Sequence, residues 1–126
     1  MSGISRDLGK RGEAQAADFL RKKGYKILAL NYRSKLGEID CIAKEQDTIC
    51  FIEVKTRSSE RFGLPSEAVS AGKQKQISRA AVAFLKEKGM LDRKARFDVV
   101  SLVYSAAGPR IDLIKNAFEL SGGFTF

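Results

Sequence analysis

The chain has 126 residues, which is enough for one domain with a hydrophobic core and too few for two. Its 23 basic and 15 acidic residues give a net charge of +8, which favours a polyanionic partner, with nucleic acid as the first candidate. The sequence has no histidine and only two cysteines, which excludes the usual Cys/His zinc sites and the nucleases and hydrolases that depend on histidine.

The first predicted element is a helix from Ser5 to Lys23, with Ser5 as its N-cap and Gly24 just after its end. On a helical wheel Glu13 shares one face with small and apolar residues, which are Gly9, Gly12, Ala16 and Leu20. We therefore expect the carboxylate of Glu13 to point inward. The alternative is a peripheral glutamate that reaches solvent or pairs with Lys10 or Arg11.

Three strands are predicted next, over Tyr25–Arg33, Leu36–Lys44 and Thr48–Thr56, from their content of β-branched and apolar residues. A two-residue turn at Gln46 and Asp47 would join the second strand to the third. A second long helix follows over Ala71–Lys88 and ends at Gly89.

The last predicted elements are a strand over Arg96–Tyr104, a turn at Gly108 and Pro109, and a short strand over Arg110–Lys115. Residues 117–126 are expected to form a loose C-terminal tail. The order is therefore α-β-β-β-α-β-β in a single α/β domain over residues 1–126, with a mixed sheet that carries a helix on each side.

Acidic residues interrupt the apolar pattern of the central hairpin. If Glu45 faces Thr48 across the turn, counting back along both strands sets Asp40 opposite Glu53 and Glu38 opposite Lys55. Because side chains alternate faces with period two, all four would point to one face of the sheet.

Two carboxylates that face each other at the distance of a cross-strand pair would repel strongly. Burial of an unpaired carboxylate costs several kcal/mol, so a bound cation is the simplest reason for the pattern. The absence of histidine leaves oxygen ligands, and the sequence therefore predicts Mg²⁺ or Mn²⁺ held by Asp40 and Glu53.

The element order, Glu13 on the first helix, and Gly-Glu-Ile-Asp (37–40) followed by Glu-Val-Lys (53–55) resemble the PD-(D/E)xK nuclease superfamily. Within it, the chain is most similar to the bacterial YraN family of uncharacterised proteins, over nearly its whole length. Further matching segments are 9–13 (GKRGE), 31–33 (NYR), 62–65 (FGLP) and 96–100 (RFDVV). The chain departs from the superfamily's signature in having Ile39 where proline precedes the aspartate.

The resemblance implies a restriction-endonuclease-like core. Matched residue by residue, it implies that Asp40 and Glu53 are metal ligands, that Lys55 is the catalytic lysine, and that Glu13 is the acid contributed by the helix. The Val54 carbonyl would add an oxygen ligand, and Glu13 would bind a second ion or hold a water.

Lys55 is expected to act electrostatically, because carboxylates close to it oppose the lowered pKa that a base would need. Glu38 would pair with Lys55 and so fix its position, with metal contact as the alternative.

Basic residues flank the proposed site and are candidates for nucleic-acid contact; they are Arg33, Arg57, Arg61 and Lys73. For the three arginines, ordinary surface exposure is the competing interpretation. For Lys73 the alternatives are phosphate binding and a structural pair with an acidic neighbour.

The sequence thus predicts a metal-dependent endonuclease that acts on DNA, with branched, recombination or repair substrates suggested by fold analogy alone. Two alternatives stay open, namely a non-catalytic nucleic-acid-binding module and an interaction subunit of a repair or recombination assembly. A homodimer is suggested by the pairing of resolvase-like relatives. No apolar run approaches 18 residues and no signal-peptide core is present, so we expect a cytoplasmic protein without membrane contact.

Overall fold

The computed structural model describes residues 3–58 and 69–120, and side chains from residue 9 onward within these ranges. The elements are α1 (Gly3–Lys22), β1 (Lys26–Ser34), β2 (Gly37–Glu45), β3 (Thr48–Arg57), α2 (Ala71–Glu87), β4 (Lys94–Ser105) and β5 (Gly108–Phe118). The five strands form one sheet in the order β1-β2-β3-β4-β5, antiparallel except for the parallel pair β3–β4. The predicted α/β fold class and the predicted order of elements are confirmed.

The C-terminal hairpin differs from the prediction. Ser105 pairs with Gly108, so the turn lies at residues 106–107 and not at Gly108 and Pro109. Strand β5 continues to Phe118, whose ring stacks on that of Phe97 at 4.8 Å between centroids. Residues 117 and 118 are therefore strand and not tail, because burial of Phe118 against Phe97 continues the pairing.

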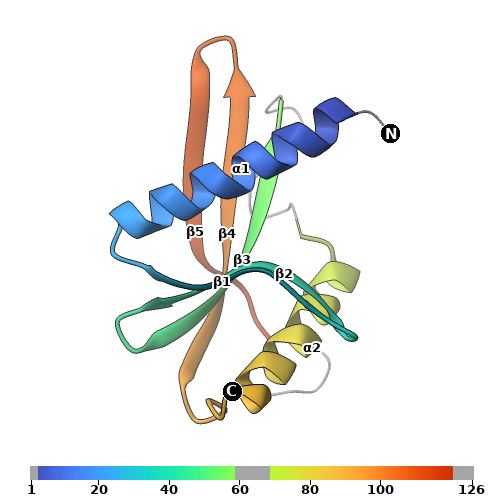
Figure 1. The fold of residues 1–126 in the computed structure, drawn as a ribbon, viewed down its shortest axis with the longest axis vertical. Coiled ribbons are helices and arrows are strands. Elements are labelled where there is room, and N and C mark those ends of the chain that lie inside the picture. The colour runs from blue at the N-terminus through green and yellow to red at the C-terminus, as the bar shows by residue number, and fades with distance from the viewer. Residues whose placement is uncertain (1–2, 59–68, 121–126) are drawn as a thin grey trace.

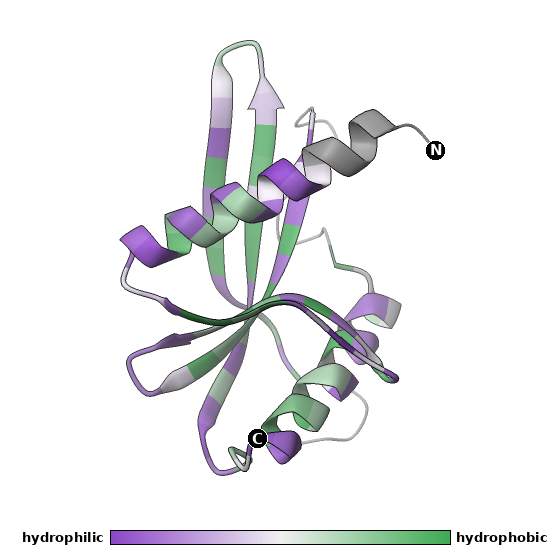
Figure 2. Cartoon of the chain, in the orientation of Figure 1, coloured by the Kyte–Doolittle hydropathy of each residue, from purple (hydrophilic) through white to green (hydrophobic). Residues whose placement is uncertain are grey.

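The two helices cover opposite faces of the sheet and different parts of it (Figure 1). One apolar cluster joins α2 to the sheet and includes Ile39, Phe51, Phe84 and Val99. A second joins α1 to the other face and includes Leu20, Cys41, Ile52 and Val100. Figure 2 shows hydrophobic residues along the central strands, and hydrophilic residues at the tips of the β1–β2 and β2–β3 hairpins.

Strands β2 and β3 separate halfway along their length. They pair from Glu45 and Thr48 up to Cys41 and Ile52, and no further pair follows. In Figure 1 the β1–β2 hairpin then bends toward α2, while β3 continues beside β4 beneath α1. The point of separation is at Asp40 on β2 and Glu53 on β3.

An ion-pair network on the α1 side ties the start of β4 to the end of β2. Arg96 contacts Glu45 at 2.6 Å and Asp98 at 3.0 Å, and the carboxylate of Asp98 is fully buried. Asp98 also accepts the N–H of Asn116 at 2.9 Å. Asp98 is therefore a structural residue with its hydrogen-bonding capacity used inside the protein.

Within the two described ranges, neither helix is long and apolar enough to cross a membrane.

Helix α1 lies close to β3 at Gly12. A Cβ atom at this position would lie 2.1 Å from the Thr56 hydroxyl and 3.2 Å from its Cβ. A glycine is therefore required for this contact, which fixes the neighbouring Glu13 above the sheet.

We predict that Gly12→Ala destabilises the protein by roughly 1–3 kcal/mol, because overpacking against Thr56 outweighs the better helix propensity of alanine. Gly9→Ala is the matched control, since no atom lies within 4 Å of its added Cβ. It should stabilise by up to about 1 kcal/mol. Equal effects of the two substitutions in thermal denaturation would show that the close contact is absent.

Candidate functional site

Asp40 occupies the gap where β2 leaves β3. Its Oδ2 accepts the backbone N–H of Val54 at 2.8 Å, a donor that would otherwise have to pair with a β2 carbonyl. The predicted register is confirmed from Glu45–Thr48 to Cys41–Ile52, where the strand pairing ends, and Asp40 meets Glu53 through their side chains just beyond it. The role of the Val54 carbonyl as a ligand stays a prediction.

Glu53 is largely buried, with 12% of its side chain exposed. Burial raises its pKa to about 8, and a hydrogen bond to Asp40 together with the negative charge of Asp40 adds to the effect. The raised pKa favours a protonated Glu53 near pH 7, and that proton lets Glu53 donate a hydrogen bond to Asp40. We call Asp40 and Glu53 the acid pair.

Lys73, in the first turn of α2, points at the acid pair. Its Nζ lies 3.7 Å from Glu53 Oε2, and Ser70 caps the helix by accepting the Lys73 N–H at 3.2 Å. Its positive charge lowers the pKa of Glu53 more than that of Lys55 does. Of the two alternatives for Lys73, the structure contains the pair with an acidic neighbour, and that neighbour is Glu53.

Lys55 is solvent-exposed on β3, two residues after Glu53. Its ammonium acts on Glu53 electrostatically, and no ion pair of Lys55 is present among the residues that the structure describes. The side chain is therefore available to a ligand at the site.

Glu13 approaches the site from α1. Its pKa is raised, first by burial and then by the charge of Asp40, while a hydrogen bond with Asn31 and the charge of Arg33 lower it. The inward orientation predicted for Glu13 agrees with these neighbours. A peripheral position beside Lys10 does not.

Asn31 is a site residue that sequence reasoning missed. It has a left-handed backbone with φ of 53°, and it lies between the β1–β2 pairs Leu30–Cys41 and Tyr32–Ile39. The available signal was an asparagine within an apolar strand, since asparagine adopts this conformation more readily than most residues.

The described acids do not form a complete metal cage. Among the side chains described in residues 9–58 and 69–120, no group of three or more Asp, Glu or Cys side chains is arranged to hold a metal ion. Asp40 and Glu53 thus make a two-carboxylate site, and Glu13 is close enough for the charge of Asp40 to raise its pKa.

Glu38 has Arg33 as its ion-pair partner in place of the predicted Lys55. It pairs with Arg33 at 3.3 Å across β1 and β2, with both side chains mostly exposed. The reason is a break in alternation at Asp40, since Ile39 packs toward α2 and Cys41 toward α1. The period-two extrapolation therefore fails beyond this point.

The flanking arginines also differ from one another. Arg57 is 7% exposed and makes contacts within the protein, so the alternative of ordinary surface exposure is wrong for this residue, while its contact with nucleic acid stays a prediction. Its strand continues between β4 and α1 and is covered there. Arg33 is exposed, and Arg61 lies outside the described residues.

Comparison with known proteins gives one consistent family. The family model described as "Uncharacterised protein family UPF0102" matches residues 12–102. A "UPF0102 protein" of Geobacter metallireducens is 47% identical over 121 residues, which cover 96% of this chain and 99% of the relative. A "UPF0102 protein" of Syntrophus aciditrophicus is 50% identical over 115 residues, covering 91% of each chain.

The raised pKa of Glu53 predicts how stability depends on pH in the metal-free protein. Between its unfolded value of 4.5 and its folded value of about 8, the folded state binds more protons than the unfolded state. The free energy of unfolding should therefore fall as pH rises from 5 to 8, by roughly 2–4 kcal/mol.

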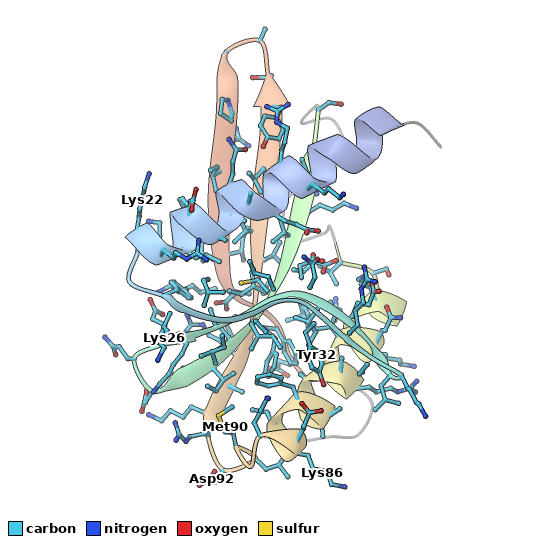
Figure 3. The ribbon with its side chains drawn as sticks, viewed as in Figure 1. Lys22, Lys26, Tyr32, Lys86, Met90 and Asp92 are labelled. Atoms are coloured by element: carbon cyan, nitrogen blue, oxygen red, sulfur yellow. The ribbon has the colours of Figure 1, made fainter. Side chains whose placement is uncertain are left out.

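Urea denaturation in EDTA at several pH values measures this slope. Glu53→Gln should flatten it, and Asp40→Asn should stabilise the protein at pH 8 because an amide keeps the Val54 hydrogen bond without the charge. Asp92→Asn, at an exposed position far from the site (Figure 3), is the control and should leave the slope unchanged. A wild-type slope that survives Glu53→Gln would contradict the assignment.

Proposed function

This chain belongs to the uncharacterised protein family UPF0102, the YraN family, and from its site we propose that it is a divalent-metal-dependent endonuclease that hydrolyses DNA phosphodiester bonds. The observation that carries the proposal is the acid pair, in which two carboxyl groups are held together between diverging strands with two lysines beside them. The proposal includes action in the cytoplasm on nucleic acid.

The donor set fits Mg²⁺ or Mn²⁺. Asp40 and Glu53 supply hard oxygen ligands, and their shared proton marks a place where positive charge is favourable. The two carboxylates would hold the ion, with the Val54 carbonyl as a further oxygen. Bound there, the ion would supply Lewis-acid stabilisation of charge on the phosphate and would make the attacking water more acidic.

The protein's own groups would do the rest. The exposed ammonium of Lys55 would stabilise the negative charge that builds on the phosphate as the water attacks. Glu13, on the α1 side of Asp40, would orient that water through a hydrogen bond. Lys73 would keep Glu53 in place through their 3.7 Å ion pair.

A non-catalytic nucleic-acid-binding module is the second candidate. It is favoured by the absence of a three-acid group among the described residues and by the Lys73 ammonium that already compensates Glu53. In that case the acid pair would be a remnant of the site, and the basic surface would carry the function.

Cleavage assays with single-stranded, duplex and branched DNA in Mg²⁺ or Mn²⁺ test the proposal. We expect cleavage by the wild type, and a loss of at least about 100-fold in Glu53→Gln and in Lys55→Ala with DNA binding retained. Glu87→Gln, which removes an exposed carboxylate paired with Lys88, is the control and should cut normally. DNA binding without cleavage in either metal would favour the second candidate function. Cleavage by Glu53→Gln at the wild-type rate would exclude the acid pair as the catalytic site.

A further inference from the structure

The outward face of α2 carries adjacent basic side chains. Lys75 and Arg79 are four residues apart, so they lie on the same face about 6 Å apart along the axis. Both are exposed, and among the described residues neither has an ion-pair partner. A like-charge pair at this spacing is unfavourable for the helix.

The N-terminal end of α2 adds to this cost. The first turn contains Lys73 and no acidic residue, although the positive end of the helix dipole favours carboxylates there. The positive charges in the N-terminal half of α2 thus disfavour the free helix. A bound polyanion would turn the same pattern into a favourable one.

The tip of the β1–β2 hairpin lies against this part of α2. Gly37 packs on Gln76 so closely that an added Cβ would be 2.9 Å from the Gln76 carbonyl oxygen. Lys35, in the turn just before Gly37, is exposed. We call Lys35, Lys75 and Arg79 the basic ridge; it combines the hairpin tip with the outward face of α2.

Helix α2 also reaches the acid pair, because Lys73, on its inward side, lies 3.7 Å from Glu53. We propose that the basic ridge binds the phosphate backbone of double-stranded nucleic acid and so delivers the duplex to the acid pair. The delivery to a cutting site rests on the proposed nuclease function, whereas the binding does not.

The surroundings of the ridge favour a duplex over a single strand. Proteins that hold single strands stack bases on exposed aromatic rings, and none of the aromatic side chains described here is fully exposed. Tyr32, the aromatic residue of the same hairpin, points onto α2 and packs edge-on against Phe84 at 5.3 Å (Figure 3). The ridge offers positive charge, which binds the phosphates of the backbone and makes no base-specific contact.

The test is equilibrium binding in EDTA, by fluorescence anisotropy at several salt concentrations, with a 30-base-pair DNA duplex, the same duplex as RNA, and single strands. The ridge variant Lys35→Gln/Lys75→Gln is compared with Lys22→Gln/Lys26→Gln, which removes two exposed lysines at the end of α1 and the start of β1 (Figure 3). The ridge variant should weaken duplex binding about tenfold or more and lower the salt slope by about 2. The control should change neither by a comparable amount.

The DNA and RNA duplexes identify which backbone the ridge takes, and ridge-dependent binding of either supports the proposal. Equal losses of duplex affinity in the two double variants would show that net charge alone accounts for the binding, and would overturn the proposal. Single strands bound as tightly as the duplexes would also overturn it.

A second readout separates binding from folding. Lys75→Glu replaces a repulsive pair with Arg79 by an attractive one, so the melting temperature should rise by roughly 1–3 °C while duplex binding weakens. A purely structural role for Lys75 would lower both. Ridge-dependent duplex binding without metal-dependent cleavage would support the ridge proposal and contradict the nuclease function. Metal-dependent cleavage without ridge-dependent binding would contradict the ridge proposal alone.

Discussion

The hydrogen bond from the Val54 N–H to the Asp40 carboxylate is the interaction on which the site depends. At this point β2 turns away from β3, and a buried N–H left without a partner would be costly. Asp40 takes the place of the missing strand partner and is thereby fixed beside Glu53. The side chain that allows the sheet to split is also the one that assembles the acid pair.

Two buried carboxylates in this protein show how a structural acid differs from a candidate functional one. Asp98 is fully buried, but Arg96 and the Asn116 N–H satisfy it within the protein. Glu53 instead has a raised pKa beside Asp40, with Lys73 at 3.7 Å as its charged partner. A cluster that keeps an unfavourable charge arrangement in the free protein is typical of a site whose ligand completes it.

The sequence was sufficient for the order of elements, for the Glu45–Thr48 register and for the convergence of Asp40 with Glu53, because all three follow from local turn chemistry and apolar patterning. It failed where the chain stops being regular. Extrapolation through Asp40 put Glu38 beside Lys55, whereas the bend at Asn31 and Asp40 pairs it with Arg33. The burial of Arg57 and the direction of the Lys73 side chain depend on how the helices pack on the sheet. Residue spacing along a strand does not predict that packing.

The central claim, that the acid pair binds a divalent ion, is tested most directly by calorimetric titration of Mn²⁺ at pH 7 in two buffers of different ionisation enthalpy. The account predicts saturable binding of about one ion with release of about one proton, since the shared proton must leave when the carboxylates take the metal. It also predicts that Glu53→Gln abolishes both signals. Saturable binding that is unchanged in Glu53→Gln, or no binding by the wild type, would contradict it.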